Sequence, residues 1–329
     1  MTTKSRARPR TTAISEGRFR GKLLAWFDQN QRDLPWRKDR DPYHVWISEI
    51  MLQQTRVAAV LDHYRRFLQR FPTVQKLAAA RESSVLALWS GLGYYRRARM
   101  LHAAAKEIVK TGGQFPSTAS GWLELPGIGR YTAAAIASIA FDEPLAVVDG
   151  NVERVLERIS GKDLAGEARW QLANQLLDPK RPGDFNQAMM ELGATLCLPR
   201  QPKCLLCPVS EVCRTRGESR NRRNGIRQKK EQIYYALNHR DGAIFLVQRP
   251  PTAALMPMMW ELPEVNRKNN AAEPWLRLRH SITVTDYTVH VTKTVVPEGT
   301  VGRWHPKSRL SQLPLTGLTR KILRAAQVI

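Results

Sequence analysis

The sequence predicts two domains: an all-α domain followed, after a basic linker, by a smaller α+β domain. Between Phe19 and Leu196 the apolar residues recur with a helical period, and no stretch alternates for long as a strand does. Residues 214–230 hold eight Arg or Lys and one Glu, which is typical of a flexible linker. Beyond it, runs rich in Val, Ile and Thr replace the helical pattern. A chain of 329 residues is long enough for each domain to have its own core.

These changes of composition set the expected boundaries. We predict a basic disordered arm over residues 1–17, the helical domain over 18–213, the linker over 214–231 and the α+β domain over 232–329. The arm has four basic and no acidic side chains in its first fifteen residues, a composition that an organellar transit peptide would share.

The periodicity also predicts the individual elements. In the helical domain we expect helices over residues 18–29, 43–69, 82–89, 95–111, 131–140, 151–159, 166–177 and 184–196. In the second domain, residues 233–237 and 243–248 flank an Asn-His-Arg-Asp-Gly turn and predict a hairpin. Residues 281–296 predict two further strands, and residues 315–328 a closing helix.

The charge of the chain indicates a polyanionic partner. There are 52 Lys and Arg against 29 Asp and Glu, a net charge of +23, and nine Trp and eight Tyr offer faces on which bases can stack. An anionic membrane surface would attract the same charge. However, no apolar run is long enough to span a bilayer and no secretory leader is recognisable, so we expect no membrane partner.

A glycine hairpin lies near the middle of the helical domain, within residues 125–151. Gly127 and Gly129 permit a tight turn before an Ala-rich helix, and a glycine turn that opens a helix presents unpaired N–H groups to a phosphate. Asp149 follows about twenty residues later, so the pattern predicts a DNA-binding hairpin beside an acid. The alternative is that Asp149 or Asn151 merely caps the next helix.

A second acid, Glu49, lies on a partly apolar helix face. Val45 and Trp46 precede it by one turn and Leu52 follows it. Desolvation on such a face raises the pKa of a carboxyl and keeps it protonated as a proton donor. The alternative is a surface Glu at a helix edge.

All four cysteines fall between Cys197 and Cys213, with the spacing C-x6-C-x2-C-x5-C. A disulfide framework would spread its cysteines through a chain of this length, so the cluster indicates one metal site in a reducing compartment. The spacing accepts either Zn²⁺ or a [4Fe–4S] cluster.

Taken together, the motifs resemble those of the adenine DNA glycosylases of the MutY type, within the endonuclease III-like helix-hairpin-helix superfamily. The resemblance extends from about Leu34 to Cys213 and continues more weakly to the C-terminus. Besides the hairpin and the Cys spacing, it is carried by LPWR at 34–37, WISEIMLQQT at 46–55, GLGYYR at 91–96, VDGNV at 148–152 and NQAMMELG at 186–193.

The resemblance implies base-excision repair of duplex DNA. Adenine mispaired with 8-oxoguanine or guanine would be flipped out of the duplex and its N-glycosidic bond hydrolysed. Glu49 would protonate adenine N7, and Asp149 would stabilise the oxocarbenium-like sugar, with Tyr131 and Asn151 as polar neighbours. One [4Fe–4S] cluster would be held by Cys197, Cys204, Cys207 and Cys213.

The same matching assigns the DNA contacts. Trp36, Arg37 and Gln187 would line the adenine pocket, while Gln54 and Tyr94 would enter the stack around 8-oxoguanine. Tyr131 stands where glycosylase/lyases of this fold have a Lys, and a tyrosine cannot form an imine, which favours a monofunctional hydrolase. The rival hypotheses are a bifunctional glycosylase/lyase that acts on oxidised pyrimidines and a non-catalytic, zinc-bearing DNA-binding protein.

The second domain resembles the Nudix-like 8-oxoguanine-recognition domain of the family, through QRP at 248–250 and WELP at 260–263. No acidic Nudix box follows, so Mg²⁺-dependent pyrophosphatase activity is not expected. Ile282-Thr283-Val284 stands where many members have Phe-Ser-His, and Thr283 would supply the remaining polar contact. We expect a monomer in the cytoplasm, on the bacterial nucleoid, with a nuclear or organellar location as the alternative. The sequence does not specify whether a sliding clamp binds it.

Overall fold

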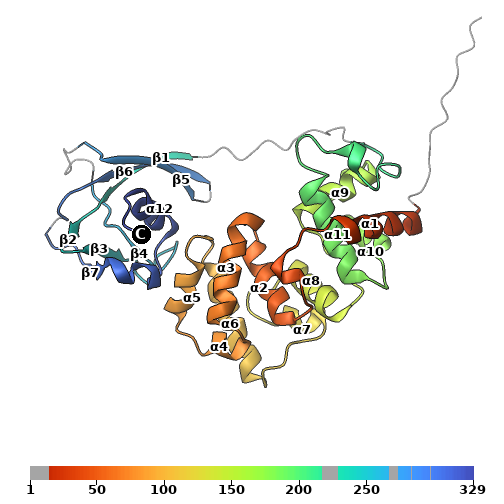
Figure 1. Cartoon of the computed structure of the whole chain (residues 1–329), viewed down its shortest axis with the longest axis horizontal. Coiled ribbons are helices and arrows are strands. Elements are labelled where there is room, and N and C mark those ends of the chain that lie inside the picture. The colour runs from red at the N-terminus through yellow and green to blue at the C-terminus, as the bar shows by residue number, and fades with distance from the viewer. Residues whose placement is uncertain (1–14, 217–228, 267–272, 283, 297) are drawn as a thin grey trace, which may run out of the picture. The chain divides into compact units, whose positions relative to one another are not determined.

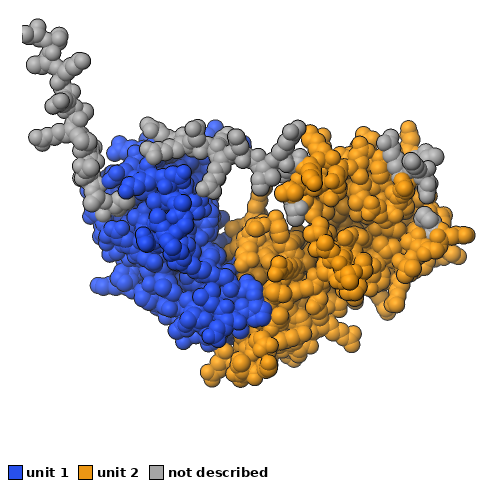
Figure 2. Space-filling view, turned by 180° about the vertical axis from the view of Figure 1, so that it is seen from behind, with its two compact units in different colours: residues 1–49, 115–222 blue, residues 50–114, 223–329 orange. Residues whose placement is uncertain are grey.

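The computed structural model describes residues 15–216, 229–266, 273–282, 284–296 and 298–329 (Figure 1). These residues confirm a helical region followed by an α+β region. By its internal contacts the chain divides into two compact units, residues 1–49 with 115–222, and residues 50–114 with 223–329 (Figure 2). The domain boundaries expected from composition stay a prediction. Most of the basic arm and of the linker lies outside the described residues.

The first unit is helical. It contains α1 (Glu16–Asn30), the 3-10 helix η1 (Pro35–Arg37), most of α2 (Pro42–Leu52), α7 (Ala119–Leu123), α8 (Arg130–Phe141), α9 (Gly150–Ser160), α10 (Glu167–Leu176), α11 (Pro182–Thr195) and the 3-10 helix η2 (Cys204–Leu206). Its core packs α1, α9, α10 and α11 through apolar side chains that include Phe19, Phe27, Leu156, Phe185 and Leu192. This packing fixes α9 and α11, and α8 packs against α11; these three helices contribute most of the candidate active site.

The second unit opens with four further helices. They are α3 (Val57–Arg70), α4 (Val74–Ala78), α5 (Glu82–Trp89) and α6 (Arg96–Lys110). The single helix predicted over residues 43–69 is wrong, because α2 ends at Leu52 and α3 begins at Val57. The apolar period continues across the break, but the last carbonyls of α2 are hydrogen-bonded by the distant Arg97. The short helices α4 and α7 were not predicted.

The strands form two small sheets. They are β1 (Lys229–Ala236), β2 (His239–Arg240), β3 (Ala243–Gln248), β4 (Trp260–Glu261), β5 (Leu276–Ile282), β6 (Thr285–Thr292) and β7 (Arg303–Pro306). One sheet has the order β1-β6-β5, with β1 parallel to β6; in the other, β2, β4 and β7 all pair antiparallel with β3.

The hairpin predicted between residues 233–237 and 243–248 is wrong in its first strand. Ile233 pairs with Val289 of β6, and only His239–Arg240 turns back onto β3. Ile233 and Tyr235 therefore face the apolar residues of a strand more than fifty positions away. Tertiary packing, rather than the turn to the next strand, determines this pairing.

The closing helix predicted over residues 315–328 is confirmed as α12 (Gly317–Ala325), after the 3-10 helix η4 (Lys307–Gln312). Its apolar face, with Leu318, Ile322 and Leu323, joins one core with residues of both sheets (Figure 1). Among the described residues, no helix is long and apolar enough to cross a membrane.

The segment before α12 contacts the helices of the same unit. Ser90 Oγ and Tyr95 Oη donate hydrogen bonds of 2.6 and 3.2 Å to the carbonyl of Leu315, and Arg320 Nε donates to Ser90 Oγ at 2.9 Å. The loop between α5 and α6 is thus hydrogen-bonded to the C-terminal part of the chain.

Candidate active site

Glu49 lies near the C-terminal end of α2 and is 6% exposed. Trp46, one turn earlier, packs against Trp122 of α7 with their rings 5.7 Å apart, so the helix face that carries Glu49 belongs to the core. Burial is the main cause that raises the pKa of this carboxyl, from its ordinary 4.5 to about 7. At neutral pH a large fraction of Glu49 is therefore protonated.

Tyr131, in the first turn of α8, contacts that carboxyl directly. Its hydroxyl donates a hydrogen bond of 2.8 Å to Glu49 Oε2, and Met190 Sδ lies 3.2 Å from the same hydroxyl oxygen. Burial and the nearby carboxylates raise the pKa of Tyr131 well above its ordinary value, so it stays a donor. The sequence placed Tyr131 beside Asp149; the structure adds this bond to Glu49.

Asp149 is the N-cap of α9. Its Oδ1 accepts hydrogen bonds from the backbone N–H groups of Asn151 and Val152, at 2.9 and 2.7 Å. The capping alternative is therefore confirmed, but it uses only one carboxyl oxygen. Oδ2 accepts one bond, from the Asn151 side-chain amide at 3.0 Å.

The two carboxyl groups influence one another. Burial raises the pKa of Asp149, while the hydrogen bonds from Val152 and Asn151 oppose that shift. The negative charge of Asp149 in turn raises the pKa of Glu49. Because Asp149 accepts three hydrogen bonds and Glu49 only one of those described, the arrangement favours an ionised Asp149 beside a protonated Glu49.

An arginine and an amide form a second polar group in this unit. Arg37 Nε donates to Gln187 Oε1 at 3.1 Å, and Arg37 Nη2 donates to the fully buried Glu191 at 2.8 Å. Arg32 binds the same carboxylate through Nε and Nη2, which keeps the pKa of Glu191 low despite its burial. Of the predicted pocket residues, the structure thus brings Arg37 and Gln187 together, and Trp36 beside them in η1 is buried.

Several residues of this network were not singled out in the sequence. Glu191 and Gly193 stand inside the NQAMMELG motif, where their i+4 and i+6 spacing from Gln187 was the available signal. A methyl group added at Gly193 would lie 2.6 Å from Asn151 Cβ, so only glycine lets α11 approach Asn151 this closely. Arg154 had no signal beyond its place one turn into α9.

Arg154 connects the acid site with the cysteine loop. Its Nη2 donates to Asn151 Oδ1 at 2.9 Å and to the Gly193 carbonyl at 2.8 Å, and its Nε donates to the Cys197 carbonyl at 2.8 Å. One side chain thus fixes the orientation of the Asn151 amide relative to the first cysteine.

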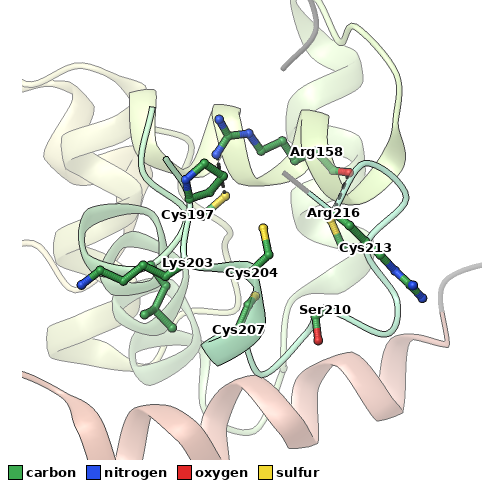
Figure 3. Close-up of a pocket in the computed structure, with 10 residues that line it drawn as sticks. Arg158, Cys197, Lys203, Cys204, Cys207, Ser210, Cys213 and Arg216 are labelled. Carbon is green, nitrogen blue, oxygen red and sulfur yellow. Dashed lines mark hydrogen bonds between the residues drawn. The ribbon is translucent and has the colours of Figure 1, made fainter. Parts of the chain in front are cut away.

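The four cysteines, Cys197, Cys204, Cys207 and Cys213, line one cavity (Figure 3). Arg158 Nη1 donates to Cys197 Sγ at 3.3 Å, and Lys203 and Arg216 also line the cavity. Among the described residues, no group of three or more His, Cys, Asp or Glu side chains is arranged to hold one metal ion. Four thiols around one cavity are a donor set that either Zn²⁺ or an iron–sulfur cluster accepts.

The predicted hairpin has the expected backbone. Gly127 is left-handed, with φ of 77°, and Gly129 is the N-cap of α8, whose first intrahelical bond runs from Ala133 N–H to the Gly129 carbonyl. The N–H groups of the first turn are thus not used within the helix. Arg130 forms an ion pair with Glu167 and stacks on Trp170 at 3.9 Å.

The remaining predicted residues are not part of this group. Gln54 and Tyr94 belong to the second unit, where both are exposed. Thr283 lies outside the described residues, although its neighbours Ile282 and Val284 are described.

Comparisons with known proteins indicate the family of this chain. A family model described as the HhH-GPD superfamily of base excision DNA repair proteins matches residues 47–176. The chain is 55% identical to the adenine DNA glycosylase of Rattus norvegicus over 212 residues, which cover 60% of this chain and 41% of that protein. It is 43% identical to the adenine DNA glycosylase of Arabidopsis thaliana over 293 residues, 74% of this chain and 46% of that protein. The chain spans about half the length of the curated relatives it matches.

Solved structures are similar over the helical part. A thermostable thymine-DNA glycosylase matches with a TM-score of 0.58 and 32% identity, over 61% of this chain and 96% of that chain. A non-covalent endonuclease III–DNA complex matches with a TM-score of 0.54 and 22% identity, over 62% of this chain and 97% of that chain. The second similarity is one of fold alone.

Proposed function

Because the chain belongs to the HhH-GPD superfamily of base excision DNA repair proteins, we propose that it removes mispaired adenine from duplex DNA by hydrolysing the N-glycosidic bond. The observation that carries this proposal is the pair of carboxyl groups: a buried Glu49 with a pKa of about 7 beside a hydrogen-bonded Asp149. Such a pair supplies a proton donor and a negative charge to one reaction.

Glu49 supplies the proton. Adenine leaves poorly as an anion, and protonation at N7 converts it into a neutral leaving group. The Tyr131 hydroxyl donates to one Glu49 oxygen, so it orients the carboxyl and leaves the other oxygen to carry the proton toward the base.

Asp149 supplies the charge. Departure of the base leaves an oxocarbenium-like sugar, which a carboxylate stabilises electrostatically or traps at C1′ before water attacks. The cap bonds fix Oδ1, and the Asn151 amide fixes Oδ2, so the charge is held in place before the reaction begins.

The same site favours hydrolysis without strand cleavage. The side chain that contacts Glu49 is a phenol, which cannot form a Schiff base with the sugar. A lyase mechanism would need an amine at this position.

A single duplex assay tests the proposal. The protein is incubated with matched duplexes that contain A:8-oxoguanine, A:G or T:G, and each sample is divided before alkali is added. We expect strand breaks only after alkali, in the order A:8-oxoguanine, then A:G, with none for T:G. Cleavage of the T:G duplex would instead favour the activity named for the thymine-DNA glycosylase, and breaks without alkali would favour a lyase.

We propose that the C-terminal α+β part, with its two sheets and α12, is a Nudix-like domain that reads 8-oxoguanine. Support comes from Gln248-Arg249-Pro250 and Trp260-Glu261, where Arg249 Nη1 donates to Glu261 at 2.7 Å and joins the two motifs. Glu261 is thereby engaged by an arginine, which agrees with the lack of a Nudix box for Mg²⁺. The duplex substrate would place the protein on the nucleoid.

The cysteine loop would hold one [4Fe–4S] cluster through Cys197, Cys204, Cys207 and Cys213. When bound, the cluster supplies a rigid cross-link for the loop rather than a group for the chemical step. The chain itself positions Lys203 and Arg216 at the cavity and ties Cys197 to Asn151 through Arg154. The basic side chains of the loop would contact DNA phosphates.

We expect Cys204→Ser to lose iron and to weaken DNA binding by at least about tenfold, because an unfolded loop withdraws its cations from the phosphates. Excision at saturating protein should fall less than affinity does. The measurements are iron content, the absorbance near 400 nm and titration of duplex DNA. The control is Ser210→Ala, which alters a cavity-lining residue that is not a proposed ligand. Full iron content with normal affinity in Cys204→Ser would contradict the assignment.

We also expect Gly193→Ala to slow adenine excision by about tenfold or more, because the added methyl group must displace Asn151, its neighbour at 2.6 Å. Single-turnover rates at saturating protein measure the effect. Gly17→Ala is the matched control, since a methyl group there meets nothing within 4 Å. Equal rates for the two variants would show that Asn151 moves without consequence.

A further inference from the structure

Two exposed residues of the second unit have an unusual backbone conformation. Gln54 and Tyr94 are left-handed, with φ of 54° and 48°, although neither is glycine. Both are exposed, and the Tyr94 side chain is an aromatic ring that is 51% accessible. Left-handed conformations are unfavourable for such residues and persist only where the surroundings impose them. An imposed conformation that presents an exposed side chain is a starting point for a functional hypothesis.

Arg97, in the first turn of α6, contacts the chain on both sides of these residues. Its Nη1 donates to the carbonyls of Ile50, Met51 and Gln53, at 2.7, 3.0 and 2.5 Å. These are three of the last four carbonyls before Gln54, and α2 ends among them. Hydrogen bonds from a distant guanidinium thus replace the partners that a continuing helix would provide.

The second nitrogen of the guanidinium completes the bridge. Arg97 Nη2 donates to Thr55 Oγ1 at 3.1 Å, immediately after Gln54. It also donates to the carbonyls of Leu92 and Gly93 at 3.4 Å, immediately before Tyr94. One planar group therefore fixes the loop that carries Gln54 and the loop that carries Tyr94 with respect to each other.

Ring contacts hold the same group in place. The Arg97 guanidinium carbon lies 5.5 Å from the ring centroid of the fully buried Trp89 and 5.5 Å from that of Tyr94. Trp89 Nε1 donates to the Gly93 carbonyl at 3.2 Å, so a hydrogen bond from the buried tryptophan holds the loop that carries Tyr94. Although burial lowers the pKa of Arg97 to about 10, the side chain stays charged at neutral pH.

We infer that Arg97 is a positioning residue that holds Gln54 and Tyr94 in the geometry from which both enter the DNA stack. The inference rests on the proposed function and on the expectation, from the resemblance, that these two residues enter the stack around 8-oxoguanine. A lysine has its donors at one point and cannot bond both loops, whereas the guanidinium fork spans them.

The test measures unstacking of DNA without base excision. The duplex contains 8-oxoguanine opposite 2′-fluoro-2′-deoxyadenosine, which resists glycosidic cleavage, and 2-aminopurine beside the 8-oxoguanine on the same strand. Entry of the two side chains unstacks 2-aminopurine and raises its fluorescence. At saturating protein, we expect Arg97→Gln to lose at least two thirds of the rise that the wild type gives. Arg97→Lys should lose most of it although it keeps the charge.

Arg96→Gln is the matched control, because it removes one exposed positive charge at the adjacent position. Since the measurement is made at saturation, a loss of affinity alone does not change the fluorescence rise. A wild-type rise in Arg97→Gln, or an equal loss in both variants, overturns the inference.

If Arg97→Gln fails to fold, Thr55→Val tests whether Arg97 positions Gln54 and Tyr94. This variant removes one acceptor of the guanidinium and keeps the shape of the side chain. A smaller rise with an unchanged melting temperature supports the inference, and a wild-type rise overturns it. The proposed function is tested separately by adenine release from the unmodified duplex. A fluorescence rise that depends on Arg97, without any adenine release, would contradict the proposed function but not the role of Arg97.

Discussion

Glu49→Gln should reduce adenine release by about 10²–10⁴-fold, because an amide of the same shape has no proton to give to N7. The structure makes this a clean substitution: the Tyr131 hydroxyl can donate to the amide oxygen as it does to the carboxyl. Affinity for the A:8-oxoguanine duplex should stay within about threefold, since Glu49 is buried and its charge is not used to hold phosphates. The measurements are single-turnover excision and a binding titration at fixed salt.

The matched control is Glu107→Gln, the same chemical change at an exposed side chain of α6 that, among the described residues, forms an ion pair with Lys110 alone. We expect wild-type excision from it. Release by Glu49→Gln within threefold of wild type would show that another group protonates the base.

The pH dependence follows from the same carboxyl. On the proposed mechanism Glu49 acts in its protonated form, so the rate at saturating protein should fall as the pH rises through about 7, its folded pKa. Asp149 acts in its ionised form, so the rate should also fall when acid protonates it, at a pKa that burial raises above the ordinary 3.8. Glu49→Gln should remove the alkaline fall in whatever activity remains.

Stability provides an independent readout of the raised pKa. The folded pKa of Glu49 lies above its unfolded value of 4.5. Its contribution to the free energy of unfolding is therefore complete below pH 4.5 and is lost as the pH rises through 7. Since a tenfold change in a proton equilibrium is about 1.4 kcal/mol, this loss amounts to a few kcal/mol at most. At pH 8 we therefore expect Glu49→Gln to melt at a higher temperature than the wild type. A lower melting temperature would mean that the buried carboxylate is well solvated.

Much of the helical region could be predicted from the sequence because its signals are local. The helix over 82–89 is found with the expected bounds, and the glycine hairpin, the Ala-rich α8 and the N-terminus of α9 depend on turn and capping chemistry within a few residues. The helix neighbours of Glu49 left both a desolvated and a surface position open, and the structure confirms the buried one. The resemblance to the MutY-type glycosylases is confirmed by the relatives, whereas the roles of the individual site residues stay predictions.

The features that could not be predicted depend on partners far away in the chain. The break after Leu52 requires the guanidinium of Arg97, and the parallel pairing of β1 requires β6. The sequence pattern around Glu191 is that of an ordinary helix residue, and its partners Arg32 and Arg37 lie more than 150 positions away in the chain. None of these contacts leaves a pattern within one window of sequence.

Asp149→Asn separates the capping role that the structure shows from the proposed role of the charge at the sugar. Asn and Asp are about equal as N-caps, so an asparagine that only capped α9 would leave stability and excision nearly unchanged. If the charge is needed at the sugar, excision should fall by about a hundredfold or more while the melting temperature changes little. Single-turnover excision and thermal melting, measured on the same preparation, distinguish the two roles.

The neighbours of Asp149 sharpen this prediction. In the wild type, the side-chain amide of Asn151 donates to Asp149 Oδ2. In Asp149→Asn the capping oxygen must still face the backbone of α9, so the amide nitrogen of the new asparagine takes the place of Oδ2 and points at the amide nitrogen of Asn151. Asn151 cannot simply rotate, because Arg154 donates to its oxygen. The double variant Asp149→Asn with Asn151→Asp restores a donor–acceptor pair and the net charge but moves the carboxylate by two residues. We expect it to keep the stability of the single variant and not to recover excision; recovery of excision would show that a negative charge anywhere in this turn is sufficient.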